Sequence, residues 1–149
     1  MEQLPPAEWR PPHAFQPGRT PEHAGPELAA IRATVDAVPA DRLTTTAAWT
    51  FGLDFLRDGY FWEAHEVLEA VWLALPPNSA ERVLCQGLIQ LANAGLKKVM
   101  QRETAAARLR QIATDRIAEG VARGGLPGLG LGQMDIKGFW QAVEQAKYA

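Results

Sequence analysis

Apolar residues recur at helical spacing along most of the chain, and no window shows the strict apolar–polar alternation of a β-strand. This spacing, read with the residues that start and stop helices, predicts a series of separate helices. They cover about residues 25–38, 47–58, 61–75, 79–101, 103–119 and 136–147. The pattern therefore predicts an all-α fold.

Several helix starts are predicted from capping residues. Thr45 or Thr46 can accept an amide hydrogen from the first turn of the second helix. Asn78 followed three residues later by Glu81 has the spacing of a capping box, and Asp135 is expected to cap the last helix.

Short connections between the helices predict how they pair. Gly59 can end the second helix in a left-handed conformation, so the helix 61–75 is expected to run back along it. The helices 79–101 and 103–119 are expected to form a second antiparallel hairpin in the same way. We therefore expect a compact helical bundle of about five to six helices built from two antiparallel helical hairpins.

The N-terminal segment has a different composition from the rest of the chain. Seven of the eleven prolines lie between Pro5 and Pro26. Because proline favours extended conformations, residues 1–24 are expected to form an extended arm packed on the body. Residues 25–149 are expected to form a single helical domain.

Composition narrows the expected partners and location. The charged fraction is 21%, the formal net charge is -2 and no long basic run occurs, so a nucleic-acid partner is not expected. The longest stretch without a charge, Val83 to Leu96, is too short to span a membrane. The single cysteine, Cys85, and the absence of a visible export signal favour the cytoplasm.

The helix 61–75 carries the residues best suited to chemistry. His65, Glu66 and Glu69 lie at the margin of its apolar stripe with Trp62 beside them, while Glu63 is expected to face solvent. The segment resembles the His-Glu-x-x-His pattern of zinc peptidases with glutamate in the last position. His65 and Glu69 can chelate a divalent metal ion, and Glu66 can then act as a general base on bound water.

A second polar pattern occurs on the helix 79–101. Gln86, Gln90, Asn93 and Lys97 form one narrow stripe on an otherwise apolar helix, and we call these four residues the amide stripe. The amide stripe is expected to be a buried polar seam that faces the helix 61–75 and lines its site.

The other two histidines, His13 and His23, lie in the arm. A docked arm can bring His23 over the helix as a third metal ligand.

The same residues also fit a purely structural role. A histidine and two glutamates can form a polar network that holds two helices in register, without any catalysis. The sequence therefore predicts either a metal-dependent hydrolase acting on a small molecule or a non-catalytic helical binding or assembly module. The tryptophans of the helix 61–75 are compatible with a contact in a homo-oligomer.

The segment from Asp58 to Trp72, followed by Gln86-Gly87-Leu88-Ile89-Gln90-Leu91-Ala92, resembles the bacterial and archaeal domain of unknown function 309 family. The resemblance covers about residues 45–120, where His65, Glu66, Glu69, Gln86 and Gln90 match the motifs of the family. It implies an all-helical bundle, and the family is sometimes labelled as predicted metal-dependent hydrolases. In the arm, Pro21-Glu22-His23 departs from the family, whose members tend to have histidine next to proline.

Overall fold

The computed structural model describes residues 3–147 of the chain and shows a bundle of helices with no strand among these residues. The ends of the predicted arm (1–24) and body (25–149) at residues 1–2 and 148–149 lie outside the described part. The α-helices are α1 (Gly25–Ala33), α2 (Ala47–Asp58), α3 (Phe61–Ala74), α4 (Ala80–Val99), α5 (Glu103–Ala122), α6 (Gly125–Gly128) and α7 (Gln133–Glu144). A 3-10 helix, η1 (Ala40–Thr45), precedes α2. The predicted all-α bundle is thus confirmed.

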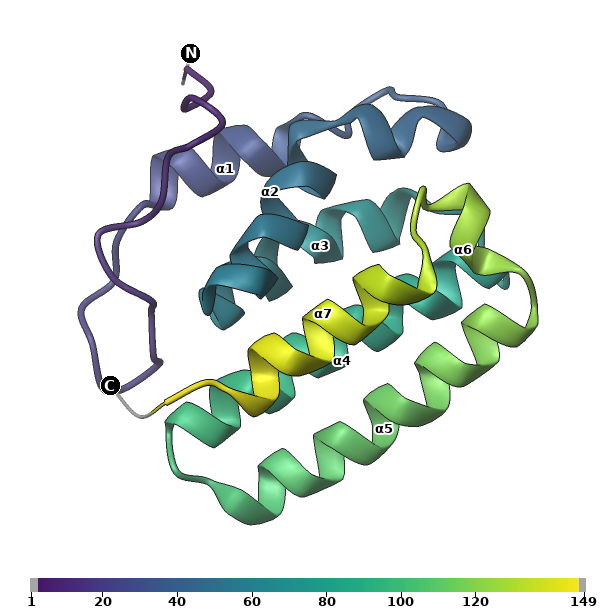
Figure 1. The fold of residues 1–149 in the computed structure, drawn as a ribbon. Coiled ribbons are helices and arrows are strands. Elements are labelled where there is room, and N and C mark those ends of the chain that lie inside the picture. Colours follow the sequence, from purple (N-terminus) through teal and green to yellow (C-terminus); the bar gives the residue numbers. More distant parts are fainter. Residues whose placement is uncertain (1–2, 148–149) are drawn as a thin grey trace.

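The helices pack as two antiparallel hairpins, α2 with α3 and α4 with α5, joined by contacts between α3 and α4. Helix α7 lies across α4 and also touches α2, and α1 packs on α3 (Figure 1).

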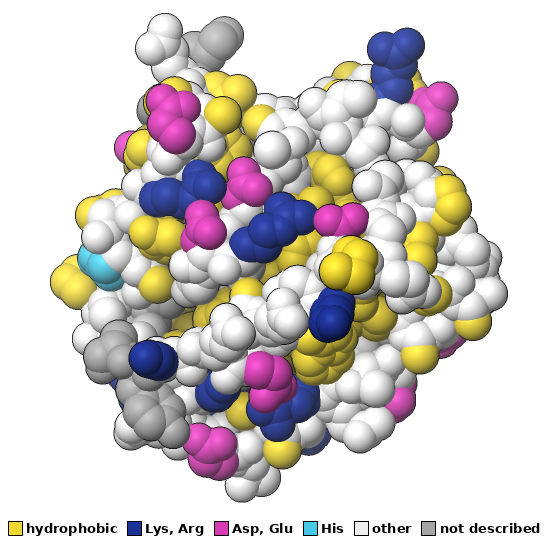
Figure 2. Space-filling model, in the orientation of Figure 1, with side chains coloured by type: hydrophobic (Ala, Val, Ile, Leu, Met, Phe, Trp, Pro, Cys, Tyr) yellow, Lys and Arg dark blue, Asp and Glu magenta, His cyan; other side chains and the backbone are white. Residues whose placement is uncertain are grey.

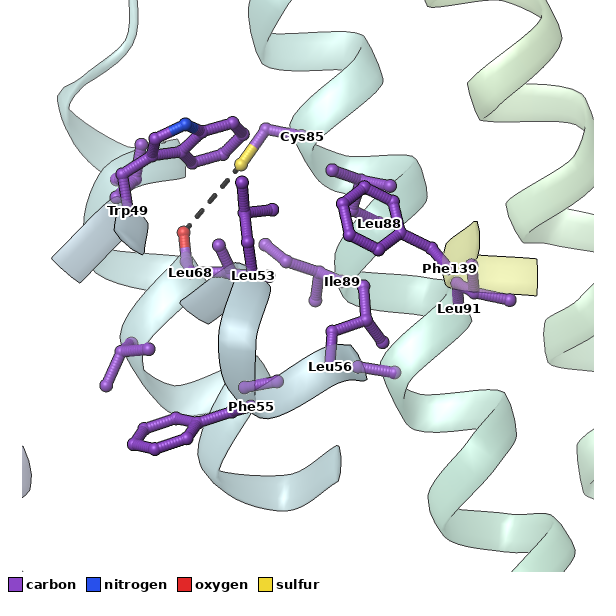
Figure 3. Close-up of a cluster of buried hydrophobic side chains, with 14 of the residues drawn as sticks. Trp49, Leu53, Phe55, Leu56, Leu68, Cys85, Leu88, Ile89, Leu91 and Phe139 are labelled. Carbon is purple, nitrogen blue, oxygen red and sulfur yellow. Dashed lines mark hydrogen bonds between the residues drawn. The ribbon is translucent and has the colours of Figure 1, made fainter. Parts of the chain in front are cut away.

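The core forms where α2, α3, α4 and α7 meet (Figure 3). Leu56, Leu68, Leu88 and Phe139, one from each of these helices, are each fully buried. The Sγ of Cys85 lies 3.8 Å from the carbonyl oxygen of Leu68, the contact drawn as a dashed line in Figure 3. Because these four helices share one core, the faces of α3 are fixed relative to the rest of the bundle.

Two of the predicted helix ends are confirmed. The Oγ1 of Thr46 accepts the amide hydrogen of Trp49 at 3.3 Å and so caps α2. Gly59 ends the same helix with φ 87°, a left-handed conformation that glycine adopts without strain.

Two predicted caps are wrong. Ser79, and not Asn78, caps α4, since the Ser79 Oγ accepts the amide hydrogen of Arg82 at 3.1 Å. Asn78 instead takes the left-handed φ of 65°, which asparagine tolerates better than most residues. Asp135 lies inside α7, where its Oδ2 accepts the amide hydrogen of Gly132 at 2.8 Å from within the first turn.

Several helix bounds also differ from the prediction. Helix α1 ends at Ala33 and not near residue 38, because from Thr34 onward the backbone amides bond three residues back and Ala37 takes a left-handed φ of 60°. The Thr34 Oγ1 accepts the amide hydrogen of Ala48 at 3.0 Å, which ties this turn to the start of α2. Helix α5 runs three residues further than predicted, and the glycine-rich stretch after it contains the short helix α6.

The N-terminal segment 3–24 contains no helix and lies against the bundle. The Trp9 ring packs edge-on against Phe51 and Phe55 of α2, with ring centroids 6.3 Å apart in both cases. Arg10 donates to the Asp58 carboxylate at 2.8 Å. These contacts bring the arm along α2 toward α3.

The face shown in Figure 2 carries acidic and basic side chains side by side, with apolar side chains between them. Among residues 3–147, no helix is both long enough and apolar enough to cross a membrane.

Candidate functional site

The exposed face of α3 presents the trio predicted from the sequence. His65 lies between two carboxylates, with its Nδ1 3.8 Å from Glu66 Oε2 and its Nε2 3.5 Å from Glu69 Oε2. The three side chains are partly exposed, with 26%, 31% and 40% of their surface accessible. Helical spacing alone places them together, as one turn of α3 separates His65 from Glu69.

Helix α1 adds a cation to this face. Arg32 donates from its guanidinium to the backbone carbonyl oxygen of Glu66, and its Nη2 lies 3.8 Å from Glu69 Oε1. Arg32 therefore bridges α1 and α3 and compensates part of the acidic charge. No local sequence pattern singles out Arg32, because the contact joins residues 34 positions apart.

Glu63 is fully buried, so the prediction that it faces solvent is wrong. Its Oε2 accepts the amide hydrogen of Phe15 at 2.9 Å and lies 3.0 Å from His23 Nε2. Burial raises the pKa of Glu63, while the Phe15 amide and the nearby imidazoles of His23 and His13 lower it. The net pKa is above the ordinary value of a glutamate.

The burial of Glu63 has a signal in the sequence. Val67 and Ala70 follow it at i+4 and i+7, so Glu63 lies on the apolar face of α3 and not on the polar face of His65. A glutamate on such a face requires a partner, because an unpaired buried carboxylate is strongly unfavourable. Here the arm supplies that partner.

His23 is the arm residue closest to this carboxylate. Only 6% of its side chain is exposed, and neither ring nitrogen makes a well-aligned hydrogen bond within the described part of the chain. Its ring lies edge-on to that of His13, with centroids 4.3 Å apart, and His13 Nε2 lies 3.0 Å from the Pro21 carbonyl oxygen. The Phe15 ring packs edge-on against Trp62 at 4.6 Å. We call Glu63, His23 and Phe15 the arm latch.

The docked arm, α1 and α3 enclose a pocket of about 270 Å³. It brings together three of the site residues predicted from the sequence, namely His23, Trp62 and Glu66. The other lining residues are Phe15, Glu22, Gly25, Leu28, Ala29 and Arg32. His65 and Glu69 lie outside this lining. We call this cavity the arm pocket.

The amide stripe is half-buried along α4. Asn93 Nδ2 donates to Gln90 Oε1 at 3.3 Å. Gln86 lines another pocket together with Trp72, so the N-terminal end of the stripe lies near the end of α3. Within residues 3–147, no hydrogen bond or ion pair joins Gln86, Gln90, Asn93 or Lys97 to the trio of α3.

A metal ion would need more donors than these residues bring together. Among residues 3–147, no group of three or more His, Cys, Asp or Glu side chains is arranged to hold one. His65 and Glu69 offer two donors, while His23 lies against Glu63. Since a catalytic zinc ion takes three protein ligands, the predicted set His65, Glu69 and His23 does not fit such a centre in this conformation.

We compared the chain with curated proteins, solved structures and protein-family models. No curated protein and no solved structure matches the chain. Residues 49–109 match the model of a family described as Domain of unknown function (DUF309). This segment includes α3 and α4, which carry the two motifs that resemble the family in the sequence. The segment 49–109 thus matches the family that the two motifs resemble.

Proposed function

We propose that the protein is a helical binding module whose arm pocket takes a small organic cation with an apolar body. The observation that carries this proposal is the meeting of Glu66 with Trp62 and His23 in one pocket of about 270 Å³. The proposal follows the non-catalytic alternative predicted from the sequence. It assigns Glu66 to ligand binding and His23 to holding the arm.

The walls of the arm pocket are largely apolar and aromatic. Phe15 and Trp62 supply aromatic surface, and Leu28 and Ala29 of α1 supply aliphatic surface. Most small-molecule pockets combine such walls with a few polar groups that fix orientation. A ligand of this pocket therefore has an apolar part.

The charges around the pocket favour a cation. Glu22 and Glu66 both line it, and Arg32, the one Lys or Arg of the lining among residues 3–147, is engaged by the Glu66 carbonyl oxygen and the Glu69 carboxylate. In the described part of the chain, the Glu66 carboxylate accepts no hydrogen bond and has only His65 as an ion-pair partner, at 3.8 Å. A carboxylate beside an indole face suits an ammonium group, which both can attract.

The arm latch gives the pocket its third wall. Because His23 and Phe15 both belong to the arm and both line the pocket, the pocket exists only while the arm is docked. The buried Glu63 holds these two residues in place through the Phe15 amide and the His23 ring. In this proposal the polar residues of α3 thus act in two ways, with Glu63 structural and Glu66 contacting ligand.

The experiment uses benzylamine and its uncharged analogue benzyl alcohol as probes, observed by NMR on the full chain. We expect saturable binding of benzylamine that Glu66→Gln weakens by about tenfold, the loss typical of one charged contact. Glu103→Gln removes the same charge from an exposed residue of α5 outside the pocket and should leave binding unchanged. Equal binding of benzyl alcohol, or equal loss in both variants, would contradict the proposal.

The hydrolytic alternative is supported only by the spacing of His65 and Glu69, whose closest atoms are 3.5 Å apart. Its test is the metal content of protein purified without chelator, compared with His65→Ala and His23→Ala. A bound metal that both substitutions remove would favour a metal-dependent reaction with Glu66 as base. Equal content in all three proteins would leave the binding module as the better account.

A further inference from the structure

A second pocket, of about 390 Å³, lies where the end of α3 meets the start of α4 and the second half of α5. Its polar lining includes three arginines, namely Arg82 of α4 with Arg116 of α5 and Arg123 just after it. It lies ten residues along α3 from the arm pocket, since Trp72 lines one and Trp62 the other. That separation is about 15 Å along a helix axis, so the two pockets are distinct.

Positive charge exceeds negative charge in this pocket. Three guanidinium groups line it with a single carboxylate, that of Glu119. Glu119 lies 3.4 Å from Arg116 Nη1 and 3.3 Å from Arg123 Nη1, so it is shared between these two arginines. Both pairs are exposed and thus weak, and the Arg123 guanidinium also donates to the Asn78 carbonyl oxygen. Neither contact cancels the positive charge that the pocket presents to an anion from solution.

Arg82 is held in place without an anionic partner. Its guanidinium carbon lies 4.2 Å from the centre of the Trp72 ring. Its Nε is buried, and no hydrogen-bond acceptor reaches that atom within residues 3–147. A buried donor without an acceptor is unusual in a folded protein, and a ligand in this pocket can supply the missing acceptor. Stacking on Trp72 also fixes the plane in which Arg82 presents its N–H groups.

We propose that this arginine pocket binds a small phosphorylated molecule through Arg82, Arg116 and Arg123. The planar fork of a guanidinium matches two oxygens of a phosphate group, and several forks can share one phosphate. The Gln86 amide lies in the same lining and can add a neutral donor. The volume of about 390 Å³ is in the range of small-molecule sites and leaves room for more than the phosphate itself.

The same chain offers a matched control for each exposed arginine. Arg108 lies on the same helix as Arg116, is exposed and is not part of the pocket lining. Arg108→Gln therefore removes one positive charge from α5 while it leaves the pocket intact. Any effect of net charge alone appears equally in Arg108→Gln and Arg116→Gln.

The test is a titration of the full chain with inorganic phosphate and with pyrophosphate at constant ionic strength, set by sodium chloride. The readout is the NMR signal of the Arg82 Nε–H group, which is buried and lacks an acceptor. We expect this signal to shift in a saturable way with both probes and to stay fixed with sodium chloride alone. Arg116→Gln combined with Arg123→Gln should weaken binding by about tenfold or more, and Arg108→Gln should leave it unchanged.

Two results would overturn the proposal. The first is an Arg82 signal that moves with ionic strength alone and does not saturate with phosphate. The second is a loss of binding in Arg108→Gln as large as in Arg123→Gln. Because Arg116 and Arg123 are exposed, their variants should fold even if Arg82→Gln does not. Benzylamine binding at the arm pocket should be the same in all of these variants, so the two proposals can fail separately.

Discussion

Replacing Glu63 by alanine should destabilise the fold more than any other single carboxylate substitution on α3. Glu63 is fully buried and accepts the amide hydrogen of Phe15 at 2.9 Å. A hydrogen bond to a charged group contributes about 1.5–3 kcal/mol, and an amide left buried without an acceptor costs about 1–3 kcal/mol. Both energies describe the loss of this one hydrogen bond, so the expected destabilisation is not their sum.

A second effect of Glu63→Ala acts in the opposite direction. The substitution also removes a carboxylate whose burial disfavours its charged form, as the raised pKa of Glu63 shows. This relief offsets part of the loss. We therefore expect the free energy of unfolding to fall by about 2 kcal/mol.

The assay is urea unfolding followed by tryptophan fluorescence. With a slope of about 2 kcal/mol per molar urea, the expected loss moves the midpoint down by about 1 M. Glu69→Ala is the control, because it removes the same group from the same helix at a side chain that is 40% exposed. Its effect should stay within about 0.5 kcal/mol. Hydrogen exchange at the Phe15 amide adds a local readout, since this amide loses its acceptor only in Glu63→Ala.

The reasoning is refuted if Glu63→Ala unfolds within about 0.5 kcal/mol of the unmodified chain, or if Glu69→Ala loses as much. Slow exchange of the Phe15 amide in Glu63→Ala would also contradict it, because that result would mean another group holds the arm.

Three further predictions concern pH, the buried thiol and a close helix crossing. The pKa of Glu63 is raised in the folded state, so its contribution to stability is complete below pH 4.5 and is lost as the pH rises through the folded pKa. Relative to Glu63→Gln, the unmodified chain should therefore gain unfolding free energy as the pH falls from 7 to 5. Paired urea titrations measure this difference, and a difference that stays constant with pH would contradict the prediction. Burial raises the pKa of Cys85 to about 12, so a thiol reagent such as Ellman's reagent should react with it only at the rate of unfolding. Rapid labelling of the folded protein would contradict the burial of Cys85 in the core. A Cβ at Gly120 would lie 2.6 Å from the Cβ of Leu84, so Gly120→Ala should lose about 2 kcal/mol of stability in thermal unfolding. Gly138 lies inside α7 with open space around it, so Gly138→Ala should gain about 0.5–1 kcal/mol. Similar effects in both variants would show that α4 and α5 are not tightly packed where they cross.

Local sequence signals were sufficient for most of the bundle. Thr46 and Gly59 mark the two ends of α2 because a cap and a left-handed turn depend on one residue and its immediate neighbours. The start of α4 was misplaced by one residue because Asn78 and Ser79 are both good caps, and the pattern alone does not choose between them. The early end of α1 involves a contact outside that helix, because the Thr34 Oγ1 accepts the amide hydrogen of Ala48 in α2.

The candidate site was only partly predictable, and the division follows sequence distance. His65, Glu66 and Glu69 could be grouped because helical geometry places them one turn apart. The partner of Glu63 could not be found in this way, since Phe15 lies 48 residues earlier in an arm without regular structure. From the sequence, Glu63 is expected to face solvent, although its spacing with Val67 and Ala70 places it on the apolar face.

The position of Glu63 changes how the polar residues of α3 are to be understood. A carboxylate on the inner face of the helix binds the arm, and a carboxylate on the outer face, Glu66, lines the pocket that the arm then closes. The two faces depend on each other, because the arm supplies Phe15 and His23 to the pocket only while Glu63 holds it. A buried polar contact and the proposed binding site are therefore not alternatives on this helix. The buried contact at Glu63 is the structural condition for the proposed site beside Glu66.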